Sequence, residues 1–187
     1  NVHNSEGVQY EEPKLKIMGI EAVKSSTPEH CRIALKEAFK IVVNGTEDEV
    51  IDFIENFKNE FRQLKPEEVA FPRSVKGLGK YKGDKYSGGI YKKSTPLHVK
   101  GSLIYNHILE KKKLESKYPL IQEGEKIKYT YLIEPNPSNQ SAISMLNTLP
   151  KEFNLDKYID YDRQFEKSFL DPMKGILETI GWNYERR

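Results

Sequence analysis

Lysines, glycines and aromatic residues alternate through the middle of this 187-residue sequence. The pattern comprises Lys80-Tyr81-Lys82, Lys85-Tyr86 and Tyr91-Lys92-Lys93, and it continues to His98 and Lys100. Lysine ammonium groups and glycine backbone N–H groups bind phosphates, whereas aromatic rings stack on bases or form the core of a small β unit. The pattern favours a nucleic-acid surface that does not read base sequence over a solvated, lysine-rich loop.

Charge is unevenly distributed along the sequence. The formal net charge is only +2, yet residues 73–117 carry +9 between flanks of −5 over residues 1–72 and −2 over residues 118–187. A basic block of this kind attracts polyanions, although composition alone fits a solvated loop equally well. We expect the basic side chains to converge on one concave surface that binds a polyanion.

The residue spacing does not favour a P-loop, a catalytic nucleophile or a metal site. Residues 77–83 lack the Gly-Lys-Ser/Thr ending of a P-loop, and Ser25-Ser26-Thr27 has no partnered His and acid. The four His have no short paired spacing, and the single Cys31 excludes an internal disulfide. Asp160 and Asp162 resemble a carboxylate pair for two-metal chemistry, but residues two apart on a helix point to opposite sides. The sequence therefore predicts no catalytic and no metal-binding residue.

Apolar periodicity predicts helices at both ends of the chain around an irregular β region, an α+β fold. Thr27 is the expected N-cap of a helix that ends at Asn44-Gly45, and a capping box from Thr46 to Glu49 begins a second helix with an apolar stripe. Prolines and glycines over 66–96 favour loops and short strands. The other predicted elements are a hairpin over 1–12, strands over 14–21, 124–132 and 142–146, a helix over 101–113, and a helical segment over 155–180 that is interrupted near Asp171-Pro172. No apolar run reaches the roughly 18 residues of a membrane span.

Four stretches, in order along the chain, resemble family B DNA polymerases and in particular their T-even-type phage members. Pro13–Glu21 followed by Lys24–Pro28 resembles the junction of palm and thumb, and Pro96–Asn106 is similar to a segment of the thumb. Glu123–Lys126 and Phe165–Phe169 are similar to later thumb segments, although these two matches are weaker. The resemblance extends over nearly the whole chain and implies the C-terminal part of the palm together with the thumb.

The resemblance also implies a division of the chain. Residues 1–24 correspond to the last strands of the palm, which include the N-terminal hairpin and strand, and residues 25–187 correspond to a helical thumb. Within the thumb, residues 25–65 are expected to form a helical hairpin, residues 66–150 a small, basic, irregular β tip with one helix, and residues 151–187 the C-terminal helices.

The resemblance implies contacts with the primer–template duplex, carried over residue by residue. The expected contacts are Lys24, Ser25 and Ser26 on the primer backbone, Lys80, Tyr81 and Lys93 on duplex phosphates at the tip with His98 and Lys100 nearby, and Lys167 on a phosphate from the last helices. Ser141 and Asp171 stand where close relatives have lysine, so these two positions are not expected to bind phosphate.

The sequence lacks the motifs that carry the catalytic aspartates of the family, which are Asp…Ser-Leu-Tyr-Pro and Asp-Thr-Asp. The resemblance therefore implies a fragment or subunit of a nucleotidyltransferase that is inactive alone and binds no cofactor itself. In the complete polymerase, Mg²⁺, nucleotide binding and chemistry belong with the fingers, catalytic palm and exonuclease, in the same or a separate chain. The expected location is the replisome of a phage in the host cytoplasm, with no membrane partner.

One alternative function stays open from the sequence alone. The chain could be a basic protein-interaction module without a nucleic-acid role. In that case the apolar stripe of Phe53, Phe57 and Phe61 would dock on a partner protein. A stripe of this kind in a two-helix hairpin is more often core, and the exposure of these rings separates the two interpretations.

Overall fold

The computed structural model describes residues 26–83 and 89–182, which belong to two compact units. The helical unit comprises the described parts of Asn1–Leu64 and Tyr161–Arg187, and the sheet unit comprises Lys65–Asp160. Helices combined with a small antiparallel sheet confirm the predicted α+β class. The hairpin over 1–12 and the strand over 14–21 lie outside the described residues, and the boundaries between palm and thumb stay predictions.

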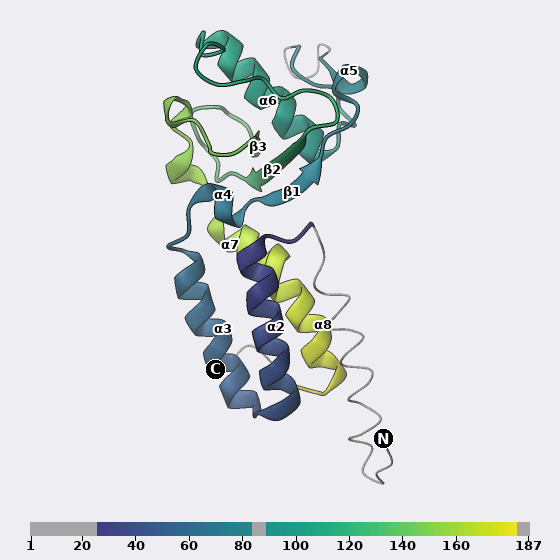
Figure 1. Ribbon diagram of the computed structural model, residues 1–187, viewed down its shortest axis with the longest axis vertical. Helices are drawn as coiled ribbons and strands as arrows, with labels where there is room; N and C mark the ends of the chain where they lie inside the picture. Colours follow the sequence, from purple (N-terminus) through teal and green to yellow (C-terminus); the bar gives the residue numbers. More distant parts are fainter. Residues whose placement is uncertain (1–25, 84–88, 183–187) are drawn as a thin grey trace. The chain divides into compact units, whose positions relative to one another are not determined.

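Two long helices, α2 (Glu29–Asn44) and α3 (Glu47–Phe61), run antiparallel in the helical unit (Figure 1). The predicted capping box begins α3, since the Thr46 hydroxyl accepts from the Glu49 N–H at 3.3 Å and the Glu49 carboxylate accepts from the Thr46 N–H at 2.8 Å. The predicted N-cap of α2 is wrong. The N-cap position, directly before Glu29, is taken by Pro28, which has no side-chain acceptor. Thr27 lies one residue before the N-cap, and its side chain is buried.

The last helical run continues through the predicted interruption. It consists of α7 (Tyr161–Phe165), the π-helical turn η4 (Glu166–Leu170) and α8 (Asp171–Thr179). Pro172 lies in the first turn of α8, and the N–H of the residue before it bonds five residues back to the Glu166 carbonyl. A proline in a helix lacks a donor and crowds the preceding turn, so a wider π-helical turn immediately before it replaces the expected break.

Aromatic rings from α3 and the last helical run form the core of the helical unit. The Phe57 ring lies 4.8 Å from the Phe169 ring and 5.8 Å from the Phe165 ring, measured between centroids. Phe61 lies 5.3 Å from Phe165, and Phe53 is half-buried at the end of the cluster. The aromatic stripe of α3 is therefore core, and it does not form an exposed surface for a partner protein.

The sheet unit is built on three antiparallel strands in the order β1 (Phe71–Ser74), β2 (Lys126–Tyr131) and β3 (Ala142–Met145). Tyr129 of β2 stands opposite Phe71 on one side and Ser144 on the other. The strands predicted over 124–132 and 142–146 are confirmed, and the alternating pattern of the first identifies it locally. The first strand is short and carries a proline, which suits its position at the edge of the sheet.

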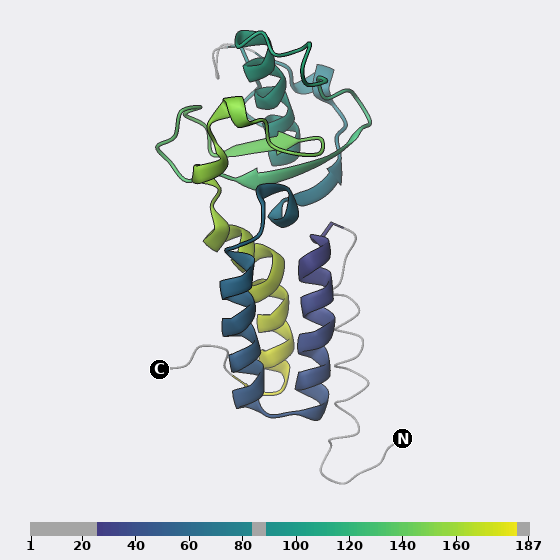
Figure 2. The same ribbon diagram turned by 60° about the vertical axis from the view of Figure 1, so that its left-hand side comes forward.

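Helix α6 (Leu97–Lys111) covers the sheet and packs most closely on β3 (Figures 1 and 2). It begins four residues before the predicted start, because Pro96 provides an extended N-cap directly before it. A Cβ atom at Gly101 would lie 2.5 Å from the Ser144 hydroxyl oxygen and 2.9 Å from its backbone nitrogen. Only glycine allows the helix to approach the strand this closely.

We predict that Gly101→Ala destabilises the sheet unit by about 1–3 kcal/mol, the usual cost of overpacking a core. The added methyl group meets the backbone of β3, which cannot move aside as a flexible side chain would. Urea unfolding followed by circular dichroism measures the loss. Gly79→Ala is the matched control, because a Cβ there meets nothing within 4 Å, and an equal loss in both variants would contradict the close approach.

The short strand β1 lies within residues 66–96, as expected, but two one-turn helices that were not expected, α4 (Pro66–Val69) and α5 (Leu78–Tyr81), lie there as well. Gly77 precedes α5 with a φ of 95°. The Glu123 carboxylate accepts hydrogen bonds from the Gly77 and Leu78 N–H groups at 2.9 Å each, and these bonds lower the pKa of Glu123. A residue 46 positions away therefore caps this helix, which local sequence cannot reveal.

Two 3₁₀ turns, η2 (Lys151–Phe153) and η3 (Asp156–Tyr158), precede α7, and η3 lies at the start of the region over 155–180 where a helix was predicted. Asn154 separates them with left-handed backbone at a φ of 58°. Ile159 then forms an isolated antiparallel bridge with Leu132, which a helical backbone cannot make. Among the described helices, none is long and apolar enough to cross a membrane.

Candidate nucleic-acid interface

A short antiparallel bridge organises the lysines that follow α5. Lys82 pairs with Tyr91, the Gly83 N–H donates to the Ile90 carbonyl at 3.1 Å, and the Lys92 N–H donates to the Tyr81 carbonyl at 3.0 Å. We call residues 80–83 and 89–93 the basic bridge. Its exposed cationic side chains are Lys80, Lys82, Lys92 and Lys93.

Glycine is required within the basic bridge. A Cβ atom at Gly83 would lie 1.6 Å from the carbonyl oxygen of Gly89, so any other residue would push the two segments apart. Gly83 therefore serves this close approach, whereas a Cβ atom at Gly79 or Gly89 would meet nothing within 4 Å. The N–H groups of Gly77 and Gly83 already donate to the Glu123 carboxylate and the Ile90 carbonyl, so in this structure they are not free to bind a phosphate as the sequence pattern suggested.

Cation–π contacts order two of the candidate lysines. The Lys100 ammonium lies 4.9 Å from the centroid of the Tyr91 ring, and the Lys80 ammonium lies 5.2 Å from the Tyr81 ring. Tyr91 is only 8% exposed, and its hydroxyl donates to the Gln140 side chain at 2.9 Å. These contacts place the first turn of α6 beside the basic bridge.

His98 is half-buried in the first turn of α6. Burial, and then the positive charge of Arg73, lower the pKa of His98 below its usual value of 6.5, so the imidazole is neutral at neutral pH. Its ring lies 6.2 Å from that of Tyr129, and its carbonyl accepts from the hydroxyls of Ser102 and Ser144. A neutral imidazole offers one N–H to a phosphate but no charge.

The structure brings some of the predicted contact residues together. Five of them lie in the sheet unit, on the basic bridge and the first turn of α6, and these are Lys80, Tyr81, Lys93, His98 and Lys100. Ser26 and Lys167 are exposed residues of the helical unit, while Lys24 and Ser25 lie outside the described residues. Lys82, Tyr91, Lys92 and Gln140 complete the site, and they were not among the predicted contacts.

Not every cation of the basic block belongs to this site. Lys111, Lys112 and Lys113 lie at the C-terminal end of α6, about 17 Å along the helix from Lys100. Lys117 follows them and bonds to Glu152. The +9 block therefore extends well beyond the basic bridge, and the convergence of all its cations on one concave surface stays a prediction. Sequence proximity placed these lysines in one block, whereas the length of α6 separates them.

A cavity of about 410 Å³ gives the surface beside the basic bridge a concave part. Its wall includes Leu78 of α5, Lys82, and Leu103 and His107 of α6. The Asn106 side chain fixes the opposite wall, because it both donates to and accepts from the backbone of Ile121 at 2.9 and 2.8 Å. The cavity lining is mixed in polarity.

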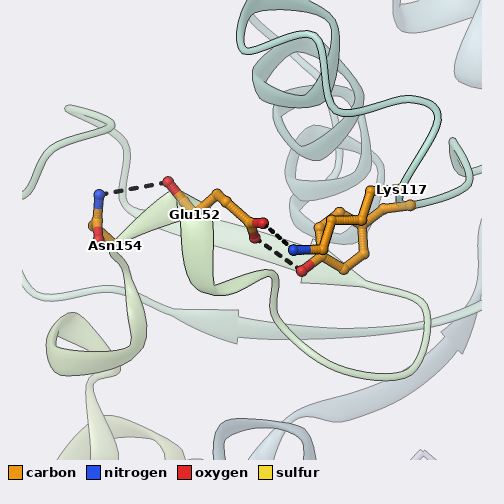
Figure 3. A network of polar contacts seen from close by, with 4 residues as sticks. Lys117, Glu152 and Asn154 are labelled. Carbon is orange, nitrogen blue, oxygen red and sulfur yellow. Dashed lines mark hydrogen bonds and ion pairs between the residues drawn. The ribbon is translucent and has the colours of Figure 1, made fainter.

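An ion-pair network joins the chain after α6 to η2 within the sheet unit (Figure 3). The Glu152 carboxylate accepts from the Lys117 ammonium at 2.6 Å and from the Tyr118 hydroxyl at 2.8 Å. These two hydrogen bonds lower the pKa of Glu152 to about 2, and the same pairing raises the pKa of Lys117. Lys117 is thus engaged in the structure of the unit.

We predict that this network makes the stability of the sheet unit depend on pH between about 4.5 and 2. The folded-state pKa of Glu152 lies below its ordinary value, so the network stabilises the fold above pH 4.5 and is lost as the pH falls. An NMR titration of the Glu152 carboxyl should show a midpoint near 2. Glu152→Gln should remove this part of the acid destabilisation in urea unfolding, and a midpoint near 4.5 would contradict the ion pair.

The described residues hold no group of three or more His, Cys, Asp or Glu that could bind a metal ion. Asp162, the second carboxylate of the pair considered above, bonds to the Arg62 guanidinium at 3.0 Å instead. A guanidinium at this distance occupies the carboxylate that a cation would need. The described part of the chain therefore does not fit the Mg²⁺ that the family resemblance implies for the complete polymerase.

The sequence of the whole chain is similar to those of two known phage proteins. No family model matches the chain. It is 32% identical over 191 residues to the DNA-directed DNA polymerase of Enterobacteria phage T4, and 34% identical over 192 residues to that of Escherichia phage RB69. Both alignments cover the whole chain but only about one fifth of the length of these curated relatives. The chain is therefore homologous, along its full length, to one region of the T-even-type phage DNA-directed DNA polymerases, as its sequence motifs indicated.

Proposed function

We propose that this chain is the palm and thumb part of a phage DNA-directed DNA polymerase of family B, which holds the primer–template duplex through phosphate contacts. The basic bridge carries the proposal. It gathers exposed lysines in a chain homologous to polymerases that must hold any DNA sequence. Lysine contacts to phosphates supply affinity and position without reading bases, which suits an enzyme that copies every template.

The geometry of the sheet unit supports a positioning role. The Lys82–Tyr91 pairing fixes the backbone from which the lysines project, and Tyr91 orders Lys100 beside it. A rigid set of phosphate contacts keeps the primer end in register for in-line attack on an incoming nucleotide. Ser26 and Lys167 of the helical unit, together with Lys24 and Ser25, would add contacts to the primer backbone.

Chemistry belongs to other parts of the polymerase in this proposal. The catalytic carboxylates, the Mg²⁺ ions and nucleotide binding would come from the fingers and catalytic palm, and proofreading from the exonuclease. This chain alone would then bind DNA without extending a primer. Its place of action would be the phage replisome in the host cytoplasm.

A salt titration of duplex binding tests the proposal. The anisotropy of a fluorescein-labelled primer–template duplex is followed as the chain is added at several salt concentrations. With about four to six phosphates engaged, the slope of log K against log salt should be roughly −4 to −5. Duplexes of unrelated sequence should bind equally well. Absence of binding at low salt would overturn the proposal.

A further inference from the structure

We propose, building on the proposed DNA-binding function, that Tyr91 is a positioning residue that holds the Lys100 ammonium group ready for a backbone phosphate. Lys100 is half-buried in the first turn of α6, with its Nζ 4.9 Å from the centroid of the Tyr91 ring. Tyr91 is only 8% exposed and offers little surface to DNA itself. Its contribution to binding therefore acts through Lys100.

Tyr91 is fixed both through its backbone and through its hydroxyl group. Its backbone pairs with Lys82 across the basic bridge, and its hydroxyl donates to the Gln140 side-chain oxygen at 2.9 Å. Gln140 is fixed in turn, because the buried Asn136 side chain donates to its carbonyl at 2.8 Å and its N–H donates to the Ser138 hydroxyl at 3.2 Å. The loop that precedes β3 thus determines where the ring lies.

A fixed ring under a lysine lowers the entropic cost of binding a phosphate. A free lysine side chain occupies many rotamers and loses them when it makes a contact, whereas Lys100 is already restrained. The attraction between cation and ring leaves the ammonium charged, and its N–H donors on the side away from the ring stay accessible. The contact therefore keeps Lys100 competent to bind an anion.

A double-mutant cycle in the 187-residue chain tests the proposal. Tyr91→Leu, Lys100→Ala and the double variant are compared in duplex binding by anisotropy. Lys100→Ala should weaken binding about eightfold at 0.1 M salt and make the salt slope about 0.9 less steep. Tyr91→Leu should weaken binding about two- to fivefold in the wild-type background and leave it unchanged in the Lys100→Ala background. An equal loss in both backgrounds would overturn the proposal.

Two further measurements separate positioning from a general effect on folding. Tyr91→Phe keeps the ring and loses only the hydroxyl, so it should bind DNA more tightly than Tyr91→Leu. In the wild-type chain without DNA, the ε-methylene protons of Lys100 should show an upfield ring-current shift that Tyr91→Leu abolishes. A random-coil shift would overturn the proposal even if Tyr91→Leu does not fold.

The ring-current measurement also distinguishes this proposal from the proposed function. If the wild-type chain fails to bind duplex DNA at low salt, both proposals are overturned as statements about DNA. A retained shift would then show that the function was wrong and the Tyr91–Lys100 geometry correct. Normal DNA binding without the shift would overturn the positioning role alone.

Discussion

Replacing Lys80 and Lys93 together by glutamate should weaken duplex DNA binding by about 60-fold at 0.1 M salt. Each lysine that neutralises a phosphate releases counterions, so each lost contact lowers the binding constant about eightfold at that salt concentration. Both side chains are exposed, and the variant should therefore fold normally. Anisotropy at several salt concentrations measures the loss, and the slope of log K against log salt should become about 1.8 less steep.

The matched control places the same charge reversal elsewhere in the sheet unit. Lys151 and Lys157 are exposed residues of η2 and η3, which lie on the left of the sheet unit in Figure 1, whereas α5 lies on the right. Lys151→Glu with Lys157→Glu changes the net charge by the same amount and should reduce binding only a few-fold. Equal losses in the two double variants would show that DNA responds to total charge and not to the basic bridge.

Elements with a local signal were predictable from the sequence. The capping box at Thr46 and the alternating pattern of β2 depend on neighbouring residues only, and both were found where expected. Helix α5 was missed because its cap, Glu123, lies 46 residues away from Gly77. The continuation of the last helical run past Pro172 was also missed. It depends on the π-helical turn before the proline, and the packing of the whole run decides whether such a turn forms.

The candidate site follows the same division between local and distant signals. The lysines at 80, 82, 92 and 93 were visible as a block, because they lie within one short, lysine-rich stretch of the sequence. The contact between Lys100 and Tyr91 was not, since it arises when α6 begins at Leu97 and turns beside the basic bridge. The sequence spacing also could not show that Lys111 lies far from the basic bridge. That distance depends on the length and direction of α6, which the spacing does not give.

Phe57→Ala should destabilise the helical unit by about 3–5 kcal/mol, the usual cost of truncating a buried phenylalanine. The ring contacts four others, and Phe169 is the nearest at a centroid distance of 4.8 Å. Removing it leaves a cavity between α3 and the last helical run that rigid neighbouring rings cannot fill. Urea unfolding followed by circular dichroism measures the change through the midpoint, with the m-value as a check on the transition.

Phe53→Ala is the control that decides between core and docking surface for the aromatic stripe. Phe53 is half-buried, so its truncation should cost roughly half as much as that of Phe57 if both rings stabilise the fold by burial. A protein-interaction stripe would give the opposite pattern, because exposed rings contribute to partner binding and little to stability. A loss below about 1 kcal/mol for Phe57→Ala would contradict its place in the core and restore the interaction module as the leading alternative. A loss of about 3–5 kcal/mol for Phe57→Ala would place the aromatic stripe in the core. The basic bridge would then be the candidate binding surface of the chain.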